Sequence, residues 1–226
     1  MITFPNAKIN IGLYITGKRP DGYHNLVSLM YPVPLYDILE FRISTTDKLI
    51  MHGIPVPGDP EQNLVLKALR LVRGKIHIPA LEIHLFKSVP TGAGLGGGSA
   101  DGAFMLNMLN DKFEAGLSRK ELEGMAEKLG SDCSFFIANR PSIINGKGEI
   151  LSPFDLDLGN YYLIILNPGV SIPTAHAYSR VRISTRPPSL EEILTEDPRT
   201  WKKKLRNDFE ESVFTKYSKI AWLKEA

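Results

Sequence analysis

Apolar and polar residues alternate near the start of the chain, and this spacing predicts a β-strand over residues 1–16. Further strands are predicted over residues 26–51 and 81–88, and residues 142–152 predict a hairpin around the turn sequence NGKGE. The run YYLIIL, residues 161–166, has the apolar character of a buried strand. The early part of the chain is therefore expected to be rich in strands.

Apolar residues at helical spacing predict helices between and after these strands. They lie after Asn63, over residues 99–111 and 118–130, from about Thr174, and in short pieces from Ser189 onward. Ser118 with Glu121 makes a capping box at the start of one helix, and Gly130 ends it. A break near Pro153 divides the chain, so we expect one domain over residues 1–152 and a second over residues 153–226.

One stretch between a predicted strand and a predicted helix is rich in glycine. It reads PTGAGLGGGSADG, residues 90–102, and has five glycines from Gly92 to Gly98. Glycine adds nothing to a packed core and loses the most entropy on folding, so this loop has another purpose. We expect Ser99 to cap the following helix and Asp101 to lie in its first turn. Free backbone N–H groups at the positive end of a helix dipole bind anions, and a phosphate is the natural ligand.

Several phosphate-binding loops share this order of strand, loop and helix. The Walker form requires a lysine after the glycines, and this chain has none there. The dinucleotide form G-x-G-x-x-G does match, at Gly92, Gly94 and Gly97. That match is weak because a glycine-rich run fits many patterns by chance, and a plain glycine hinge is a third alternative. The rest of the chain decides among them.

Composition and charge narrow the class of protein. The 226 residues are 43% hydrophobic and 23% charged, and a net charge of +2 does not favour nucleic acid or an anionic membrane as partner. Cys133 is the sole cysteine, so no disulfide can form within the chain. No apolar run approaches the ~20 residues of a membrane span, and the first residues lack the pattern of a signal peptide. We therefore expect a cytoplasmic globular protein, whose oligomeric state the composition leaves open.

Three further places carry candidate chemistry, and each also has an ordinary structural explanation. Lys8 and Asn10 share one face of the first strand, where a solvated lysine is the simpler interpretation. Tyr23 and His24 end a turn, a common place for exposed or packed rings. Asp132 precedes an apolar run, either as a helix N-cap or as a partly buried acid.

Taken in order, these places resemble the GHMP kinases, a superfamily named for galactokinase, homoserine, mevalonate and phosphomevalonate kinases. The matching pieces are PNAKINIGLYITGKRPDGYHNL (5–26), VPTGAGLGGGSAD (89–101), LGSDCSFFI (129–137), GKGE (146–149), NPGVSIPT (167–174) and NDFE (207–210). The glycine loop alone indicates the superfamily. KRPDGYH and NPGVSIPT are similar to members that phosphorylate a cytidine diphosphate-linked small molecule in the non-mevalonate route to isoprenoids.

The resemblance implies a two-domain α+β fold, with an N-terminal domain like domain 2 of ribosomal protein S5 and a ferredoxin-like C-terminal domain that is incomplete here. It implies ATP and Mg²⁺ as cofactors and leaves the metal ligands open. The residues implied to bind ATP are Pro90, Thr91, Gly92, Ala93, Gly94, Leu95, Gly96, Gly97, Gly98, Ser99 and Ala100, with Asn63 and Leu64 near the adenine. Those implied to bind the acceptor are Asn10, Tyr23, His24, Thr174 and Tyr178. Asp132 is implied as the catalytic acid–base residue and Lys8 as its cationic partner.

The resemblance also has departures. Tyr23 and Tyr178 are implied to stack on the cytosine while His24 binds its polar edge, although the family usually has phenylalanine where Tyr178 stands. Ala100 stands where the family often has a second serine. A third glycine-rich motif, late in the C-terminal domain, is absent from the sequence, so roughly fifty further residues are expected by resemblance.

Other functions compete with a kinase. A dinucleotide-binding oxidoreductase has its glycine loop after the first strand of a βαβ unit, whereas this loop starts at Pro90, behind strands that look antiparallel. Asp111 and Glu114, near the spacing of the ribose-binding acid, flank a helix end and do not follow a strand. A non-catalytic nucleotide-binding module and a GHMP kinase with a different acceptor stay open.

Overall fold

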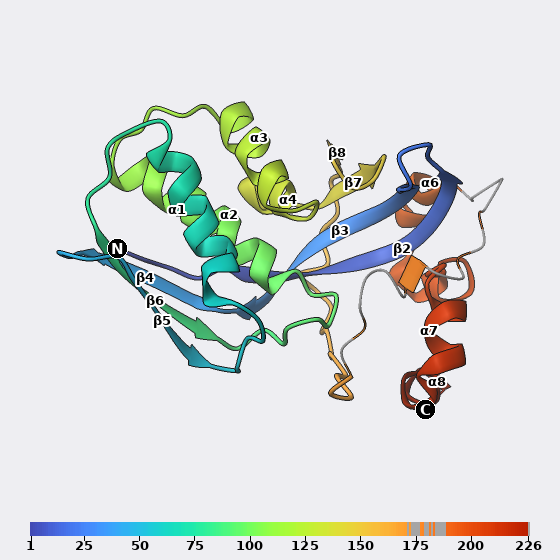
Figure 1. Cartoon of the computed structure of the whole chain (residues 1–226). Coiled ribbons are helices and arrows are strands. Elements are labelled where there is room, and N and C mark those ends of the chain that lie inside the picture. The colour runs from blue at the N-terminus through green and yellow to red at the C-terminus, as the bar shows by residue number, and fades with distance from the viewer. Residues whose placement is uncertain (171, 173–176, 179–180, 182, 184–188, 226) are drawn as a thin grey trace. The chain divides into compact units, whose positions relative to one another are not determined.

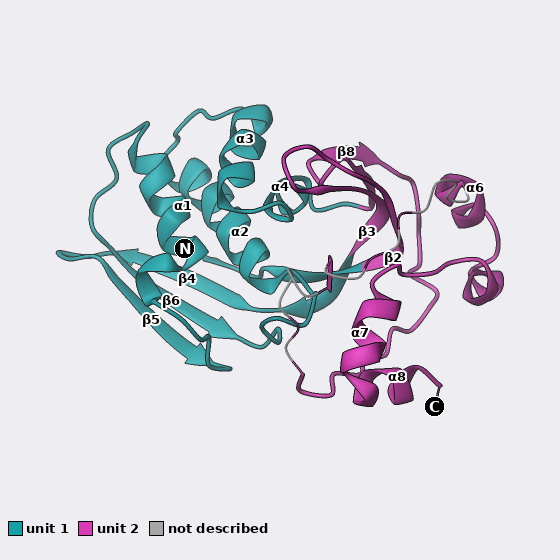
Figure 2. Cartoon of the chain, turned by 45° about the vertical axis from the view of Figure 1, so that its right-hand side comes forward, with its two compact units in different colours: residues 1–9, 32–140 teal, residues 10–31, 141–226 magenta. Residues whose placement is uncertain are grey.

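The computed structural model describes residues 1–226 except 171, 173–176, 179–180, 182, 184–188 and 226. Residues 1–9 and 32–140 form one compact unit, unit 1, and residues 10–31 and 141–226 form another, unit 2 (Figure 2). This division differs from the expected one, because residues 10–31 group with the later part of the chain. Contact density alone does not define a folding domain, so the boundary at residue 152 stays a prediction.

Unit 1 has a mixed four-stranded sheet, built from segments in which apolar and polar residues alternate. Its strands, in spatial order, are β1 (Ile2–Thr3), β4 (Ile38–Ile43), β6 (Leu81–Lys87) and β5 (Lys48–Gly53). Neighbours are antiparallel except β5 and β6, which run parallel. Phe41 pairs with Ile83 and both are buried, so the register turns one apolar face toward the core. A sheet of this kind does not have the parallel order of a dinucleotide-binding domain.

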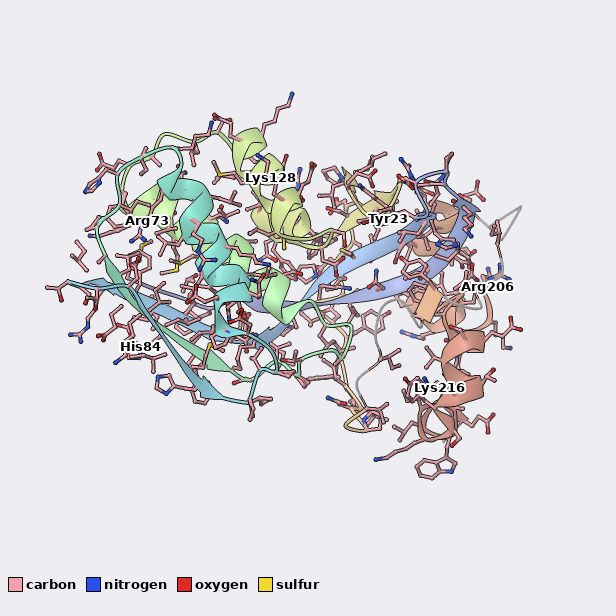
Figure 3. The ribbon with its side chains drawn as sticks, in the orientation of Figure 1. Tyr23, Arg73, His84, Lys128, Arg206 and Lys216 are labelled. Carbon is pink, nitrogen blue, oxygen red and sulfur yellow. The ribbon has the colours of Figure 1, made fainter. Side chains whose placement is uncertain are left out.

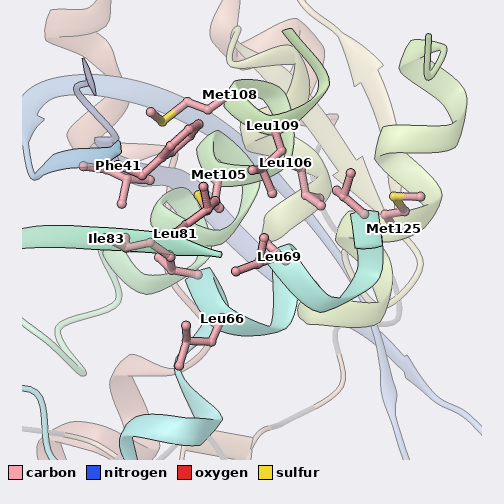
Figure 4. Packing of buried hydrophobic residues seen from close by; sticks show 14 of the residues in the cluster. Phe41, Leu66, Leu69, Leu81, Ile83, Met105, Leu106, Met108, Leu109 and Met125 are labelled. Atoms are coloured by element: carbon pink, nitrogen blue, oxygen red, sulfur yellow. The ribbon is translucent and has the colours of Figure 1, made fainter. Parts of the chain in front are cut away.

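Helices of unit 1 cover that apolar face (Figure 1). They are α1 (Leu64–Arg73), α2 (Gly97–Lys112), α3 (Arg119–Leu129) and α4 (Cys133–Ala138), with the 3₁₀ helix η1 (Pro60–Gln62) before α1. As predicted, Ser118 and Glu121 form a capping box on α3, and Gly130 follows its last turn. Leu69, Leu81 and Met105 belong to one buried cluster between helices and sheet (Figure 4). Each fully buried side chain of this size contributes about 1.5–3 kcal/mol, which fixes the helices on the sheet.

Unit 2 has a second four-stranded sheet. Its strands, in spatial order, are β2 (Asn6–Lys18), β3 (His24–Tyr36), β7 (Ser142–Asn145) and β8 (Ile150–Pro153). The first residues of β2 and the last residues of β3 belong to unit 1. Leu29 pairs with Ile143, and β7 and β8 pair antiparallel, which confirms the predicted hairpin over residues 142–152.

Short helices follow in unit 2, as predicted from Ser189 onward. They are α6 (Leu190–Leu194), η2 (Pro198–Lys203), α7 (Glu210–Lys216) and α8 (Ser218–Glu225). Tyr14, Leu29 and Trp201 lie in the buried cluster of this unit. The helix predicted from about Thr174 falls mostly outside the described residues. Each unit combines a β-sheet with helices, which confirms the α+β class. No helix among the described residues is long and apolar enough to cross a bilayer.

The apolar run 161–166 is exposed and forms no strand, so the prediction of a buried strand there is wrong. Tyr162 is fully exposed, and 82% of the surface of Ile164 is accessible. A strand needs a neighbouring strand to take up its backbone N–H and C=O groups, and no described strand pairs with this segment. Apolar composition alone does not build a strand.

Candidate active site

The glycine-rich stretch joins the end of β6 to the start of α2. Helix α2 begins at Gly97, and its N-cap is Gly96, which has a φ of 71°. The prediction that Ser99 caps this helix is wrong, because Gly96 adopts the left-handed conformation and lets the helix begin before Ser99. The prediction for Asp101 is wrong for the same reason, because Asp101 lies in the second turn with a buried side chain.

Glycines shape the backbone of this loop. Gly92, Gly94 and Gly96 have φ values between 71° and 75°, a region that other residues enter only at a cost. A Cβ added at Gly94 or at Gly98 would meet no atom within 4 Å, so the loop is open beside these two residues. The first N–H groups of an α-helix lack intrahelical partners, and the dipole is positive there. The arrangement suits a phosphate group, and the binding of ATP by residues 90–100 stays a prediction.

Lys8 lies next to this loop. Its backbone N–H donates a 2.9 Å hydrogen bond to the carbonyl oxygen of Leu95, which ties β2 to the loop. Only 4% of the surface of Lys8 is accessible, so the interpretation of Lys8 as a solvated strand residue is wrong. Its Nζ lies 3.3 Å from Oδ2 of Asp132. The structure thus brings together two of the predicted residues that are far apart in the sequence.

Asp132 stands at the N-cap position of α4, but its side chain makes no capping hydrogen bond. Its carboxylate faces Lys8, and about a third of the side chain, 31%, is exposed. A Cβ added at Gly96 would lie 3.0 Å from both Lys8 and Phe136, so the loop, the lysine and α4 are in close contact. An acid and a cation beside this glycine loop are suited to proton transfer next to a bound phosphate, and the catalytic roles of Asp132 and Lys8 stay predictions.

Cys133 follows Asp132 in the sequence, but its side chain is buried. Burial raises the pKa of the Cys133 thiol to about 12, while a hydrogen bond with Ser99 opposes that rise. A thiol with this pKa is not a thiolate at neutral pH and is no nucleophile. Cys133 instead belongs to the buried cluster of unit 1.

Asn63 and Leu64 begin α1. The Oδ1 atom of Asn63 accepts a 2.9 Å hydrogen bond from the backbone N–H of Val65, so this side chain caps the helix. A Cβ added at Gly102 would lie 3.0 Å from Leu64, which places the start of α1 against α2. Capping alone explains why Asn63 stands here, and its predicted place near the adenine stays a prediction.

In unit 2, Tyr23 lies at the end of a tight turn (Figure 3). The backbone N–H of Arg19 donates to the carbonyl oxygen of Tyr23 at 2.8 Å, and Gly22 supplies a φ of 85°. Tyr23 is 60% exposed, and Nζ of Lys147 lies 5.1 Å from the centroid of its ring. The turn therefore presents one solvent-exposed aromatic ring beside a cation.

His24 and Tyr178 stack on each other, with ring centroids 5.2 Å apart and planes 22° from parallel. Tyr178 also meets the edge of Phe209, at 4.7 Å between centroids. The sequence did not predict Phe209 here, although it belongs to the NDFE piece. The side chain of Asn10 donates a 2.9 Å hydrogen bond to Oγ of Ser28. Thr174 lies outside the described residues, so its predicted role has no structural account.

Sequence reasoning missed a buried charge cluster below the glycine loop. It consists of Asp37, Lys87 and Asp101, all of which are at most 3% exposed. Burial raises the pKa of Asp101 to about 7; the Lys87 ammonium opposes this rise and the Asp37 carboxylate adds to it. The available signal was Lys87 itself, a charged residue at a core-facing position of β6.

A separate shallow hollow of about 450 Å³ lies on the outer face of the unit 1 sheet. The rings of His52 and His84 stack there, 5.5 Å apart, and Arg42 pairs with Glu82. None of the residues described as lining it is a predicted site residue. This hollow is therefore distinct from the glycine loop.

Comparison with known proteins agrees with the arrangement in unit 1. The family model described as "GHMP kinases N terminal domain" matches residues 63–140, which include the glycine loop and Asp132. The 4-diphosphocytidyl-2-C-methyl-D-erythritol kinase of Bacteroides fragilis is 48% identical over 229 residues, covering 100% of this chain and 84% of that protein. The protein of the same name from Parabacteroides distasonis is 47% identical and is covered to 83% of its length.

Solved structures give the same result. A crystal structure of 4-(cytidine 5'-diphospho)-2C-methyl-D-erythritol kinase has a TM-score of 0.77 and 28% identity, covering 100% of this chain and 81% of that one. Mevalonate kinase from Methanococcus jannaschii has a TM-score of 0.50 at 12% identity over 69% of this chain, which supports the fold alone. Because relatives of nearly half identity match it from end to end, this chain belongs to the GHMP kinases, as its motifs implied.

Proposed function

We propose that this chain is an ATP-dependent kinase that phosphorylates the 2-hydroxyl group of 4-diphosphocytidyl-2-C-methyl-D-erythritol, on the non-mevalonate route to isoprenoid precursors. Relatives that match its full length bear the name of that enzyme. The observation that carries the chemistry is the ion pair between Lys8 and Asp132, tied to the glycine loop by the hydrogen bond from Lys8 to Leu95.

The glycine loop holds the phosphates of ATP in this proposal. Backbone N–H groups of the loop and of the first turn of α2 are the donors, and the helix dipole adds positive potential. Phosphoryl transfer requires little covalent chemistry from the protein, and depends on positioning and on charge stabilisation. Three left-handed glycines let the backbone of the loop approach a ligand closely, which suits both tasks.

Asp132 acts as the general base. It accepts the proton of the acceptor hydroxyl while that oxygen forms a bond to the γ-phosphorus; the bond from the γ-phosphorus to its bridging oxygen breaks, and ADP leaves. The Lys8 ammonium, 3.3 Å from the carboxylate, holds Asp132 in place by their ion pair and helps to orient the acceptor hydroxyl. The partial exposure of Asp132 supports access by an acceptor.

Mg²⁺ neutralises part of the phosphate charge when it is bound. Within the described ranges, no group of three or more His, Cys, Asp or Glu side chains could hold a metal by itself. Mg²⁺ in kinases usually takes only one or two protein ligands, so it would not need such a group. The Ser99 hydroxyl, which also hydrogen-bonds the Cys133 thiol, is a protein oxygen in the first turn of α2 that could hold such an ion.

We assign recognition of the cytidine diphosphate moiety to residues of unit 2. They are Asn10, Tyr23, His24, Thr174 and Tyr178. The open ring of Tyr23 can stack on a base, and a stack of this kind contributes about 1–3 kcal/mol in single-stranded nucleic-acid sites. The imidazole of His24 offers a donor and an acceptor to the polar edge of that base.

Incubation of the chain with ATP, Mg²⁺ and the cytidine substrate tests the proposal. We expect ADP to form together with a product whose new phosphomonoester is visible by ³¹P NMR, and cytidine diphosphate to compete. Phosphorylation of mevalonate or galactose without phosphorylation of the cytidine substrate would show the acceptor to be wrong. Preference for NAD over ATP in a titration would reject the kinase class.

A further inference from the structure

The buried cluster of Asp37, Lys87 and Asp101 joins three separate elements of unit 1. Asp37 lies between β3 and β4, Lys87 is the last residue of β6, and Asp101 belongs to α2. Nζ of Lys87 donates to Oδ2 of Asp37 and, at 2.6 Å, to Oδ2 of Asp101. Burying three charged groups is costly and often adds nothing to stability, so the cluster calls for another explanation.

Asp37 fixes the point where the chain leaves the sheet. Its Oδ1 atom accepts hydrogen bonds from the backbone N–H groups of Ser88, at 2.6 Å, and Val89, at 2.9 Å. These are the first two residues after β6, immediately before the glycine loop. The backbone N–H of Asp37 donates to the carbonyl oxygen of Pro5 at 2.8 Å, so the anchor is itself held.

The same cluster fixes the point where the chain enters α2. Asp101 projects from the second turn of the helix onto Lys87. The first turn packs on the cluster as well, since a Cβ added at Gly97 would lie 3.3 Å from Oδ2 of Asp37 and 2.9 Å from Val89. Both ends of the loop, residues 88–89 and 97–101, are therefore tied to one ammonium group.

A loop rich in glycine has many conformations, and a ligand that selects one of them bears the ordering cost. Fixing the ends of the loop in advance lowers that cost and raises affinity. Oδ2 of Asp101 accepts from Lys87, whereas Oδ1 is buried without a hydrogen-bond partner. The side chain is therefore positioned for Lys87 although one of its oxygens is unsatisfied. Such an arrangement lowers the stability of the folded chain but favours one conformation of the loop.

We infer that Lys87 is a positioning residue which, by bridging Asp37 and Asp101, holds the glycine loop in its ATP-binding conformation. The inference rests on the proposed binding of ATP by this loop. The Lys87 side chain is only 3% exposed, so its proposed effect on ATP acts through the loop. Its loss should weaken the binding of ATP and leave the binding of the cytidine moiety unchanged.

The test measures the affinities of ATP and of cytidine diphosphate by calorimetry in Lys87→Met. We expect the Kd for ATP to rise about tenfold or more and the Kd for cytidine diphosphate to stay within about twofold. This variant leaves two buried carboxylates without a cation and can fail to fold. The triple variant Asp37→Asn, Lys87→Met, Asp101→Asn removes every charge and keeps an oxygen for Ser88 and Val89, and the same result is expected from it.

Glu82→Gln is the matched control, because Glu82 is an ion-paired carboxylate on the outer face of the same strand. It should change neither affinity. A folded triple variant with the wild-type Kd for ATP would overturn the inference, as would an equal loss of both affinities. If the wild-type chain binds no ATP, the proposed function fails first; if Gly98→Ala weakens ATP binding and the triple variant does not, the inference alone fails.

Discussion

The two groups of proposed site residues are held in different ways. In unit 1, Lys8 is buried, its backbone donates to the glycine loop, and its ammonium pairs with Asp132. In unit 2, Tyr23 is largely exposed at a turn, and His24 stacks on Tyr178. One group is locked by packing and charge, whereas the other offers open or stacked rings.

The difference follows from the tasks that we propose. Proton and phosphoryl transfer require reacting atoms within a narrow range of distance, so the groups involved benefit from a rigid surrounding. Recognition of a base by rings tolerates small shifts and gains affinity from surface that is still exposed before binding. Changes in unit 1 should therefore act on turnover or ATP, and changes in unit 2 on the acceptor.

The largest effect is expected from Lys8→Met, which removes the ammonium and keeps the length of the side chain. The kcat should fall by about 10²-fold or more, because the charge beside Asp132 is lost, while the Kd values for ATP and cytidine diphosphate should stay within about threefold. Steady-state kinetics with calorimetry checks this. Lys48→Met, at an exposed strand lysine of the same unit, is the control and should behave as wild type. Equal turnover in the two variants would remove Lys8 from the chemistry.

A smaller effect, on ATP alone, is expected from Gly98→Ala. The added methyl group would lie on the open side of the first turn of α2, where the phosphates are proposed to bind, and should raise the Kd for ATP about tenfold. Gly98 is a better probe than Gly96 or Gly97, where a Cβ would meet the surrounding core at 3.0 Å or less and disturb folding.

Gly124→Ala supplies the control for this change, because Gly124 is also helical and open, on α3. Gly124→Ala should raise the melting temperature, since alanine favours a helix interior by about 1 kcal/mol over glycine, and Gly98→Ala should raise it less because Gly98 lies in the first turn of α2. Gly98→Ala alone should weaken ATP binding. The phosphate site would have to be placed elsewhere if the two variants bound ATP equally well.

Changes in unit 2 should alter the binding of the acceptor. Tyr23→Ala should raise the Kd for cytidine diphosphate about fivefold, near the lower end of the 1–3 kcal/mol that one stack contributes, and leave ATP binding unchanged. Tyr23→Phe keeps the ring and should restore the affinity. Tyr162→Ala, at a fully exposed ring of the same unit, should have no effect. A loss of ATP affinity in Tyr23→Ala would assign this turn to the adenine.

Asp101→Asn should have the smallest effect on activity. Its expected effect is on the pH dependence of stability. Burial raises the pKa of Asp101 from 3.8 to about 7, so the folded protein holds a proton there that the unfolded chain has released. Its contribution to the free energy of unfolding should therefore fall as the pH rises from about 4 to about 7, by at most about 1.4 kcal/mol per unit. Denaturant titrations of wild type and Asp101→Asn should show that the free energy of unfolding of wild type falls with pH across this range relative to that of the variant. The same pH dependence of the free energy of unfolding in both proteins would contradict the raised pKa of Asp101.

Local patterns made much of the site predictable. The glycine run, the turn before Tyr23 and the capping box of α3 are each written within a dozen residues, and the structure has all three features. The proximity of Lys8 and Asp132 came from resemblance, because no local pattern joins residues so far apart. The structure confirms that they meet.

What the sequence did not predict depends on long-range contacts. Lys87 lies 50 residues from Asp37, so only the pairing of β4 with β6 brings them together. The start of α2 was misplaced because a left-handed glycine replaced the expected serine cap. The run 161–166 was misjudged because apolar composition gives no information about a partner strand.

The central claim is that Asp132 takes the acceptor proton beside an ATP-binding loop, and the turnover of Asp132→Asn tests it most directly. The amide keeps the size of the side chain but cannot act as a base, so kcat should fall by about 10²-fold or more while ATP and cytidine diphosphate still bind. The double variant Lys8→Met, Asp132→Asn should be little slower than either single variant, because groups that act as a unit are not additive. Turnover near that of wild type in Asp132→Asn would contradict the claim.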